Sequence, residues 1–477
     1  MEQETNNNQH SESCGKEAQG LLTQLNQGEA VYHDVDQYEI FVDHFIQKNQ
    51  LRSALRIVDY ASDQHNGSIS LWIKRAQIIF NLGQIDESIK LAKHCLRFEP
   101  NNAELFYLIG TGYLNMNKPN KAKKYFEQTF NASSENLDEV LFNIGYVYEQ
   151  VMDYTNAIIF FRQAIKNNQE NLHAIYDLAY CYDKIDNHKK AVWAYKHYLE
   201  KEPYNCSVWF NLGISLNSLG NPEEALEAYD YALAINDKHT AALFNKANLL
   251  SHNGEFEEAI ETYNEYLKLE PDADDAYCYI ADCYFNLRNY TEAIRSYKNA
   301  IKANKQNDCA WYGGALILLL NEDYEECLAF LKQSVKINPD ISDYWISIGK
   351  VSTILNNYEE GEYALEKAIS LSPKETEVWL EMAHFYHHYD QTSMAVDTLK
   401  RSKAFITNQT NILYAIAAYA FMDGQEEYGY QYLLRALEIN AEECETLLFE
   451  SFPDVEKISK VSKVVREYQS KILVNIS

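Results

Sequence analysis

The spacing of proline is the feature that most constrains how this chain can fold. Five of its eight prolines are separated by 103, 68, 68 and 34 residues, which are multiples of 34 with one residue inserted in the first interval. They are Pro100, Pro203, Pro271, Pro339 and Pro373. A fixed period of this length is typical of a repeat array in which each repeat packs against its neighbours. With this proline at position 32, twelve repeats fill residues 35–443, starting at residues 35, 69, 103, 138, 172, 206, 240, 274, 308, 342, 376 and 410.

Small residues recur at two positions that do not define this register. Position 8 is Gly or Ala in eleven of twelve repeats, and position 20 is small in all twelve. Position 4 carries a large apolar residue throughout, and position 24 is aromatic in six consecutive repeats, so the sixth repeat has Trp209, Gly213, Ala225 and Tyr229 at these four positions. Small side chains let two helices approach closely, and large ones fill the space beside them. The pattern predicts two short helices per repeat, A and B, with the proline between helix B and the next helix A.

The sixth repeat, with W-F-N-L-G-I-S-L followed by G-N-P-E-E-A-L-E-A-Y-D-Y-A-L, resembles the tetratricopeptide repeat family. The resemblance covers 409 of the 477 residues. It implies an all-α fold, a right-handed α-solenoid in which helices A line the concave face and helices B the convex face.

The two ends lie outside the repeats. Residues 1–34 have few large apolar residues and many Asn, Gln and Glu, which predicts a mobile polar tail. Residues 444–477 predict C-terminal capping helices, because Pro453 interrupts a helix and Asp454 can N-cap another that carries an apolar stripe.

The sequence gives little room for catalysis. Each end leaves 34 residues, too few for a catalytic domain, and the chain has no Gly-rich phosphate loop, GxSxG or HExxH motif. Its nine cysteines are odd in number and unclustered, which favours free thiols in a reducing compartment. We therefore expect a non-catalytic protein without a cofactor. No secretory signal and no apolar run of about 18 residues are present, so we expect a cytoplasmic chain without membrane insertion.

Aromatic residues mark a candidate binding surface. In the resembled family, positions 2, 5, 6, 9, 12 and 13 of helix A face the groove. Position 5 is aromatic in five consecutive repeats, and Asn follows it at position 6 in three of them. These groove candidates are Tyr107, Phe142, Asn143, Tyr176, Phe210, Asn211, Phe244 and Asn245. Rigid aromatic rings and Asn amides suit contact with a protein segment, but position 5 also adjoins the next helix A, so a packing role stays open.

Charge indicates the kind of partner. The chain has 42 basic and 70 acidic residues, a net charge of −28, which disfavours nucleic acid. Bases are depleted at the groove positions, so a neutral or basic protein segment is expected. A chaperone's acidic tail is disfavoured, because the Lys, Asn and Arg clamp used by that branch of the family is missing from successive repeats. Asp36, Glu39 and Asp43 form an acidic end patch that could receive Lys or Arg.

Two other functions remain open. His384 and His388 share one helix face near Glu381, a weak candidate for a metal site and thus for a metal-responsive or small-molecule regulator. A self-assembling structural adaptor, and hence a homo-oligomer, is the third reading.

Overall fold

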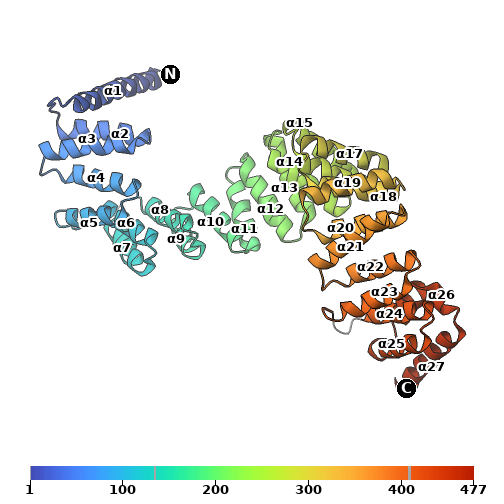
Figure 1. Cartoon of the computed structure of the whole chain (residues 1–477). Coiled ribbons are helices and arrows are strands. Elements are labelled where there is room, and N and C mark those ends of the chain that lie inside the picture. The colour runs from blue at the N-terminus through green and yellow to red at the C-terminus, as the bar shows by residue number, and fades with distance from the viewer. Residues whose placement is uncertain (1, 134–135, 407–409, 477) are drawn as a thin grey trace. The chain divides into compact units, whose positions relative to one another are not determined.

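The computed structural model describes residues 2–133, 136–406 and 410–476, with side chains for 15–133, 136–406 and 410–468. All secondary structure in these residues is helical (Figure 1). The chain divides into two compact units, Met1–Asp237 and Lys238–Ser477, which are described separately. Each unit is a series of helix pairs packed one after another, so the predicted α-solenoid fold is confirmed.

The first unit contains helix α1 (Glu2–Gln27) and six helix pairs. In each pair the first helix is helix A and the second is helix B. The pairs are α2 (Val35–Gln47) with α3 (Leu51–Gln64), α4 (Ile69–Asn81) with α5 (Ile85–Cys95), α6 (Ala103–Asn115) with α7 (Pro119–Ala132), α8 (Leu137–Gln150) with α9 (Tyr154–Asn167), α10 (Leu172–Lys184) with α11 (His188–Leu199), and α12 (Cys206–Ser218) with α13 (Pro222–Ile235).

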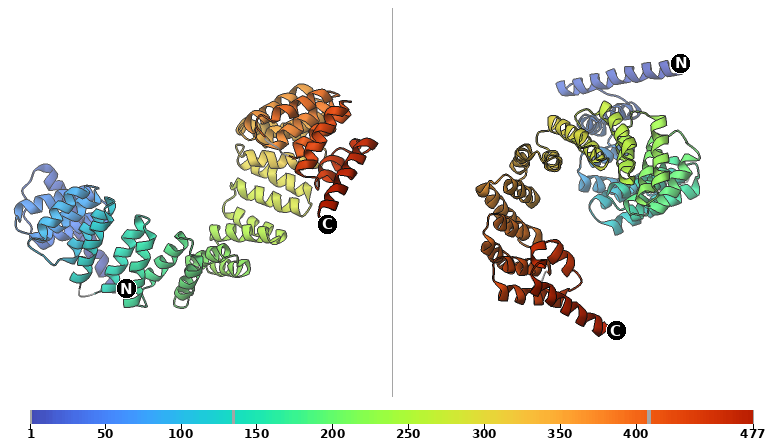
Figure 2. Two further views of the ribbon diagram at one scale, coloured as in Figure 1. Left: turned by 90° about the horizontal axis from the view of Figure 1, so that it is seen from below. Right: turned by 90° about the vertical axis from the view of Figure 1, so that its right-hand side faces the viewer.

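The second unit contains six further pairs and a C-terminal extension (Figure 2). The pairs are α14 (Thr240–Asn253) with α15 (Phe256–Leu269), α16 (Asp274–Asn286) with α17 (Tyr290–Ala303), α18 (Asp308–Leu320) with α19 (Tyr324–Ile337), α20 (Ser342–Ile354) with α21 (Tyr358–Leu371), α22 (Thr376–His388) with α23 (Thr392–Ser402), and α24 (Thr410–Met422) with α25 (Glu426–Ile439). A π-helical turn η1 (Glu445–Glu450), α26 (Pro453–Glu456) and α27 (Ser459–Ile476) follow.

Helices A of neighbouring repeats lie next to one another in each unit. Consecutive helices A touch, as α6, α8 and α10 do in the first unit and α20, α22 and α24 in the second. Within a unit, helix B packs on its own helix A and on the next one, as α9 does on α8 and α10. The surfaces of helices A therefore lie side by side along a unit.

A close contact sets the distance between helices A and B. A Cβ atom added at Gly213 would lie 2.5 Å from Cε1 of Tyr229, well inside van der Waals contact. The same relation, at 2.7 Å, links Gly110 to Phe126. The small residue at position 8 therefore receives the face of the ring at position 24, which explains why both recur along the sequence.

Specific polar contacts fix where helix A begins. The side chain of Asn205 caps α12 by accepting a hydrogen bond from the backbone N–H of Val208, at 3.2 Å. The indole Nε1–H of Trp209 donates to the carbonyl of Pro203, at 2.7 Å. The same bond joins Trp345 to Pro339 at 2.8 Å and Trp379 to Pro373 at 2.9 Å. The carbonyl at position 32 thus pairs with the tryptophan at position 4 of the next repeat, and Trp311 makes the same bond to Lys305, at 3.1 Å.

A residue with a left-handed backbone conformation, that is a positive φ, follows the end of every helix A. Position 15 has a positive φ in all twelve pairs, and only four of these residues are glycine. The other eight are Asn49, Asn117, Met152, Asp186, Arg288, Glu322, Asn356 and Asp390. Residues with a Cβ are strained in this region, Asn and Asp less so than the others.

The predicted mobile polar tail at the N-terminus differs from the structure, which has a helix there. Residues 2–27 form α1 rather than a mobile tail, and Ala18, Leu21 and Leu25 are buried in a core cluster with Phe41 and Phe45 of α2. Only a few apolar residues in this polar segment face α2, so composition alone did not reveal the helix.

The C-terminal extension also differs in detail from the prediction. The last helix begins at Ser459 instead of following Asp454, which lies in the short α26. Val455, Val461 and Val465 of the predicted stripe are buried with α24 and α25, so the segment covers the end of this core.

The contact between Gly213 and Tyr229 predicts a specific destabilisation. Replacing Gly213 with Leu should lower the free energy of unfolding by roughly 1–3 kcal/mol, because the side chain has no space beside the ring. Urea denaturation followed by circular dichroism measures this. Asn217→Leu, at an exposed position of the same helix, is the control and should stay within about 0.5 kcal/mol of wild type. Equal midpoints for the two variants would contradict this packing.

The left-handed turn predicts a stabilising substitution. Met152 has φ of 61° and is 75% exposed, so its side chain contributes little packing. Met152→Gly should raise the free energy of unfolding by about 0.5–1 kcal/mol by removing backbone strain. Gly220→Ala at the same repeat position should lower it by a similar amount. A destabilised Met152→Gly protein in thermal melts would show that the turn is not strained.

Candidate functional site

The first unit carries four of the five predicted aromatic residues on consecutive helices A. Each is half-buried, neither sealed in the core nor fully exposed. One side of each ring packs on the aromatic residue at position 24 of the same repeat. The ring-centroid distances are 6.3 Å for Tyr107 and Phe126, 5.7 Å for Phe142 and Phe161, 6.3 Å for Tyr176 and Tyr195, and 6.1 Å for Phe210 and Tyr229. The row therefore has a packing role and still offers ring surface to solvent.

The predicted Asn residues lie in different surroundings. Asn143 is exposed on α8. Asn211 Nδ2 donates to the hydroxyl of Tyr176 at 3.0 Å, so one of its groups already joins two repeats. In the second unit, Asn245 is half-buried beside Phe244, whose ring packs among Tyr263, Tyr266 and Tyr279.

Two half-buried carboxyl groups lie close to the aromatic row. Burial, and then repulsion from Asp177, raises the pKa of Glu149 on α8 to about 7. Burial raises the pKa of Asp177 on α10 to about 6, against an opposing effect of His173. The thiol of Cys181 donates to Glu149 Oε2 at 3.8 Å, whereas Asp177 has no hydrogen-bond partner among the described side chains. A cationic group placed here would stabilise both ionised forms.

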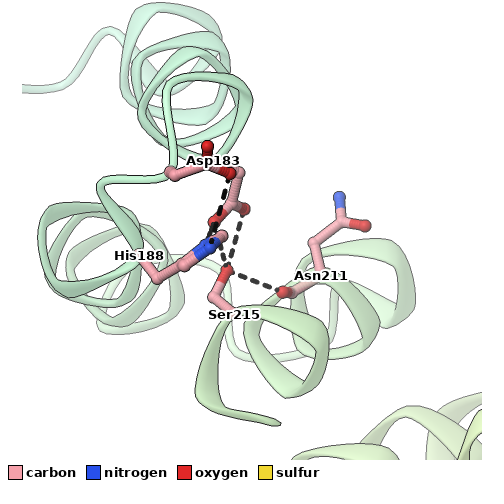
Figure 3. Close-up of polar contacts among 5 residues, drawn as sticks. Asp183, His188, Asn211 and Ser215 are labelled. Carbon is pink, nitrogen blue, oxygen red and sulfur yellow. Dashed lines mark hydrogen bonds and ion pairs between the residues drawn. The ribbon is translucent and has the colours of Figure 1, made fainter. Parts of the chain in front are cut away.

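A third carboxylate ties three helices together (Figure 3). Asp183 of α10 accepts from Ser215 Oγ of α12 at 2.8 Å and lies 3.0 Å from Nδ1 of His188, at the start of α11. The residue types match those of a hydrolase triad, but the order differs. The carboxylate lies between serine and imidazole, whereas nucleophilic catalysis needs the imidazole next to the hydroxyl. The arrangement therefore serves as a structural link between repeats.

The acidic end patch is partly neutralised. Asp43 forms an ion pair with Lys74 of α4, while Asp36 is exposed and Glu39 half-buried on α2. The three carboxylates therefore do not act as one free acidic face.

The structure does not bring together the weak metal candidate. No group of three or more His, Cys, Asp or Glu among the described side chains has an arrangement that could hold a metal. Glu381 pairs with Lys350 at 3.2 Å, and His384 Nδ1 lies 2.7 Å from the hydroxyl of Tyr419. His388 is exposed. Glu381 and His384 therefore already have partners of other kinds.

Glu149, Asp177 and Cys181 are residues of this site that were not among the predicted groove residues. Asp177 occupies position 6, where its neighbours have Asn, and Cys181 occupies position 10. The sequence itself shows that an acidic residue replaces Asn at position 6 of this repeat. The raised pKa values depend on burial, which a sequence does not give.

Family models match much of the repeat region. Tetratricopeptide repeat models match residues 69–102, 103–136, 138–171, 210–276 and 274–307, and a model of anaphase-promoting complex, cyclosome, subunit 3 matches residues 299–368. No curated protein shows significant sequence similarity to the chain. None of the helices described is both long and apolar enough to span a bilayer.

Solved structures with similar folds share little sequence. The C-terminal part of a TPR repeat-containing protein from Cytophaga hutchinsonii is 14% identical, with a TM-score of 0.46 over 50% of this chain and 97% of its own. YrrB, described as a TPR protein with an unusual peptide-binding site, is 22% identical, with a TM-score of 0.35 over 40% and 98%. MamA is 21% identical, with a TM-score of 0.35 over 36% and 94%.

The matched repeats and the paired helices define an α-solenoid of the protein-interaction class. The chain belongs to the tetratricopeptide repeat family. Proteins of this family bind protein partners and are generally non-catalytic scaffolds.

The buried carboxyl of Glu149 predicts a pH-dependent stability. Because folding raises its pKa from 4.5 to about 7, the folded chain binds more protons than the unfolded chain between these values. The free energy of unfolding should therefore decrease as the pH rises through this window. Glu149→Gln should be more stable than wild type at pH 8, by about 1–2 kcal/mol, and lose this advantage near pH 4.5.

Urea denaturation at pH 8, 6 and 4.5 measures the effect. Glu139→Gln, at an exposed position of the same helix, is the matched control. If both variants differ from wild type by the same amount at every pH, Glu149 is not the group responsible.

Proposed function

We propose that this protein is a non-catalytic scaffold that binds a basic protein segment along the helix A surface of its first unit. The observation that carries the proposal is the combination of four half-exposed aromatic rings with the carboxyl groups of Glu149 and Asp177 on the same run of helices. The rings offer rigid contact area, and the carboxylates select a cationic side chain.

Each group has a distinct role in this proposal. Tyr107, Phe142, Tyr176 and Phe210 anchor the segment, and the exposed amide of Asn143 pairs with its backbone. In the second unit, Phe244 and Asn245 present the same residue types and form a separate candidate contact. A Lys or Arg between Glu149 and Asp177 replaces the solvent that burial has removed.

The carboxylates make binding pH-dependent. A bound cation lowers the pKa of both groups, so binding near neutral pH releases protons. Glu149, with a pKa of about 7, and Asp177, with a pKa of about 6, are both protonated at pH 5 and mostly ionised at pH 8. Affinity for a cationic segment should therefore rise with pH over this range.

Two labelled peptides test the proposal. One alternates Lys and Arg with apolar residues, and the other has Glu and Asp in their place. Fluorescence anisotropy with the full chain should show tighter binding of the cationic peptide at pH 8 than at pH 5. Phe142→Ala/Tyr176→Ala/Phe210→Ala should weaken binding about tenfold or more, and Glu149→Gln/Asp177→Asn should remove the pH dependence.

The control replaces aromatic residues away from the row. Tyr32 and Tyr204 are 72% and 84% exposed in the same unit, so Tyr32→Ala/Tyr204→Ala should bind like wild type. Circular dichroism confirms that each variant is folded. Equal affinity of the triple variant and wild type for the cationic peptide, or a pH dependence of that binding that the carboxylate variant leaves unchanged, would contradict the proposal.

A further inference from the structure

A second surface lies on the helix B side of the first unit. A pocket of about 910 Å³ opens between helices α9 and α11, with α10 at its base. The two helices B each pack on α10, so a gap is left between them. Ile175, Leu178 and Tyr182 of α10 are buried and form the base.

The rims of this pocket expose large apolar side chains. Trp193 of α11 is 61% exposed, and Ile159 of α9 is 47% exposed. The ring of Trp193 stacks on His197, with centroids 5.7 Å apart, which holds its orientation. An indole held at the edge of an apolar pocket is the typical anchor of a protein contact, because Trp supplies a large contact area at a small entropic cost.

The charge of the pocket is opposite to that of the chain. Its lining includes Arg162, Lys166 and Lys190, and it has no Asp or Glu, although acids outnumber bases 70 to 42 in the sequence. Arg162 and Lys166 are exposed and form no ion pair with any side chain that the structure describes. Lys190 Nζ lies 5.4 Å from the ring centre of Tyr182, which keeps it at the edge of the apolar base.

The cationic groups are spread along the pocket. Arg162 and Lys166 are one helical turn apart on α9, about 6 Å along the axis, and Lys190 lies on α11 at the opposite rim. An extended or helical segment with several carboxylates can pair with cations on both helices at once.

We propose that this pocket binds an acidic, amphipathic segment of a partner protein. One large apolar side chain of the segment enters between Ile159 and Trp193, and its carboxylates pair with Arg162, Lys166 and Lys190. This segment is acidic and binds on the helix B side, whereas the segment proposed for the helix A surface is basic. The scaffold can therefore hold two different partners at once.

Labelled peptides and the full chain test this inference. The probe is a short fluorescein-labelled peptide in which Glu and Asp alternate with Leu and Phe, measured by anisotropy at low and high salt. Lys166→Glu/Lys190→Glu and Trp193→Ala should each weaken binding about tenfold or more, and salt should weaken binding to wild type. The control Lys123→Glu/Lys124→Glu makes the same charge change at exposed positions of α7 and should alter affinity less than about twofold.

Other outcomes would overturn the inference. Equal losses in the pocket variant and the α7 variant would mean that binding follows net charge alone. Octanoate binding that depends on Trp193, with no peptide binding, would assign the pocket to a small anionic amphiphile. The variant Phe142→Ala/Tyr176→Ala/Phe210→Ala should bind the acidic peptide like wild type. The experiment therefore separates a failure of this pocket proposal from a failure of the proposed function of the helix A surface.

Discussion

The structure depends on how closely helix A and helix B of one repeat approach each other. At Gly213 there is no room for a Cβ atom beside the ring of Tyr229, and Gly110 has the same relation to Phe126. The ring fills the space that the small residue leaves, so the pair sets both the distance and the orientation of the two helices. Gly145 and Phe161 make the same contact, so in these repeats one geometry recurs along the unit and sets how the helices A follow one another.

The inner surface is therefore partly structural. Asp183 links α10, α11 and α12, Asn211 bonds to Tyr176 of the preceding repeat, and Lys350 bridges to Glu377 and Glu381 of the following one. Polar groups at these positions of helix A hold neighbouring repeats together. A polar residue on helix A is thus a binding candidate only when its partners inside the chain are known, and Asp177, which lacks a hydrogen-bond partner among the described residues, stands out for this reason.

The 34-residue period was enough to predict the fold class and the helix pairs, because small and large residues alternate at fixed positions that packing requires. The turn at position 15 could not be predicted, since Met152, Arg288 and Glu322 adopt a positive φ that their residue types disfavour. Helix α1 was missed because a few buried side chains among polar ones leave no strong periodic signal. The aromatic row was identified from the sequence. How much of each ring is packed and how much is exposed depends on its contact with the residue at position 24, and position 5 taken alone does not show that contact. The pocket between α9 and α11 belongs to helices B, where the resemblance gave no reason to look.

Charge separation between the two faces gives the first unit its chemical polarity. On the helix A side, burial raises the pKa of Glu149 to about 7 and that of Asp177 to about 6, so their charge changes with pH close to neutrality and a bound cation favours the ionised forms. On the helix B side, Arg162 and Lys166 are exposed and charged at all times, and they can steer an acidic segment from a distance. One face therefore selects by desolvation and the other by long-range attraction. Lowering the pH protonates the carboxylates of the helix A side and weakens binding there, but the cations of the helix B side keep their charge. Partner binding on the two faces can therefore change independently.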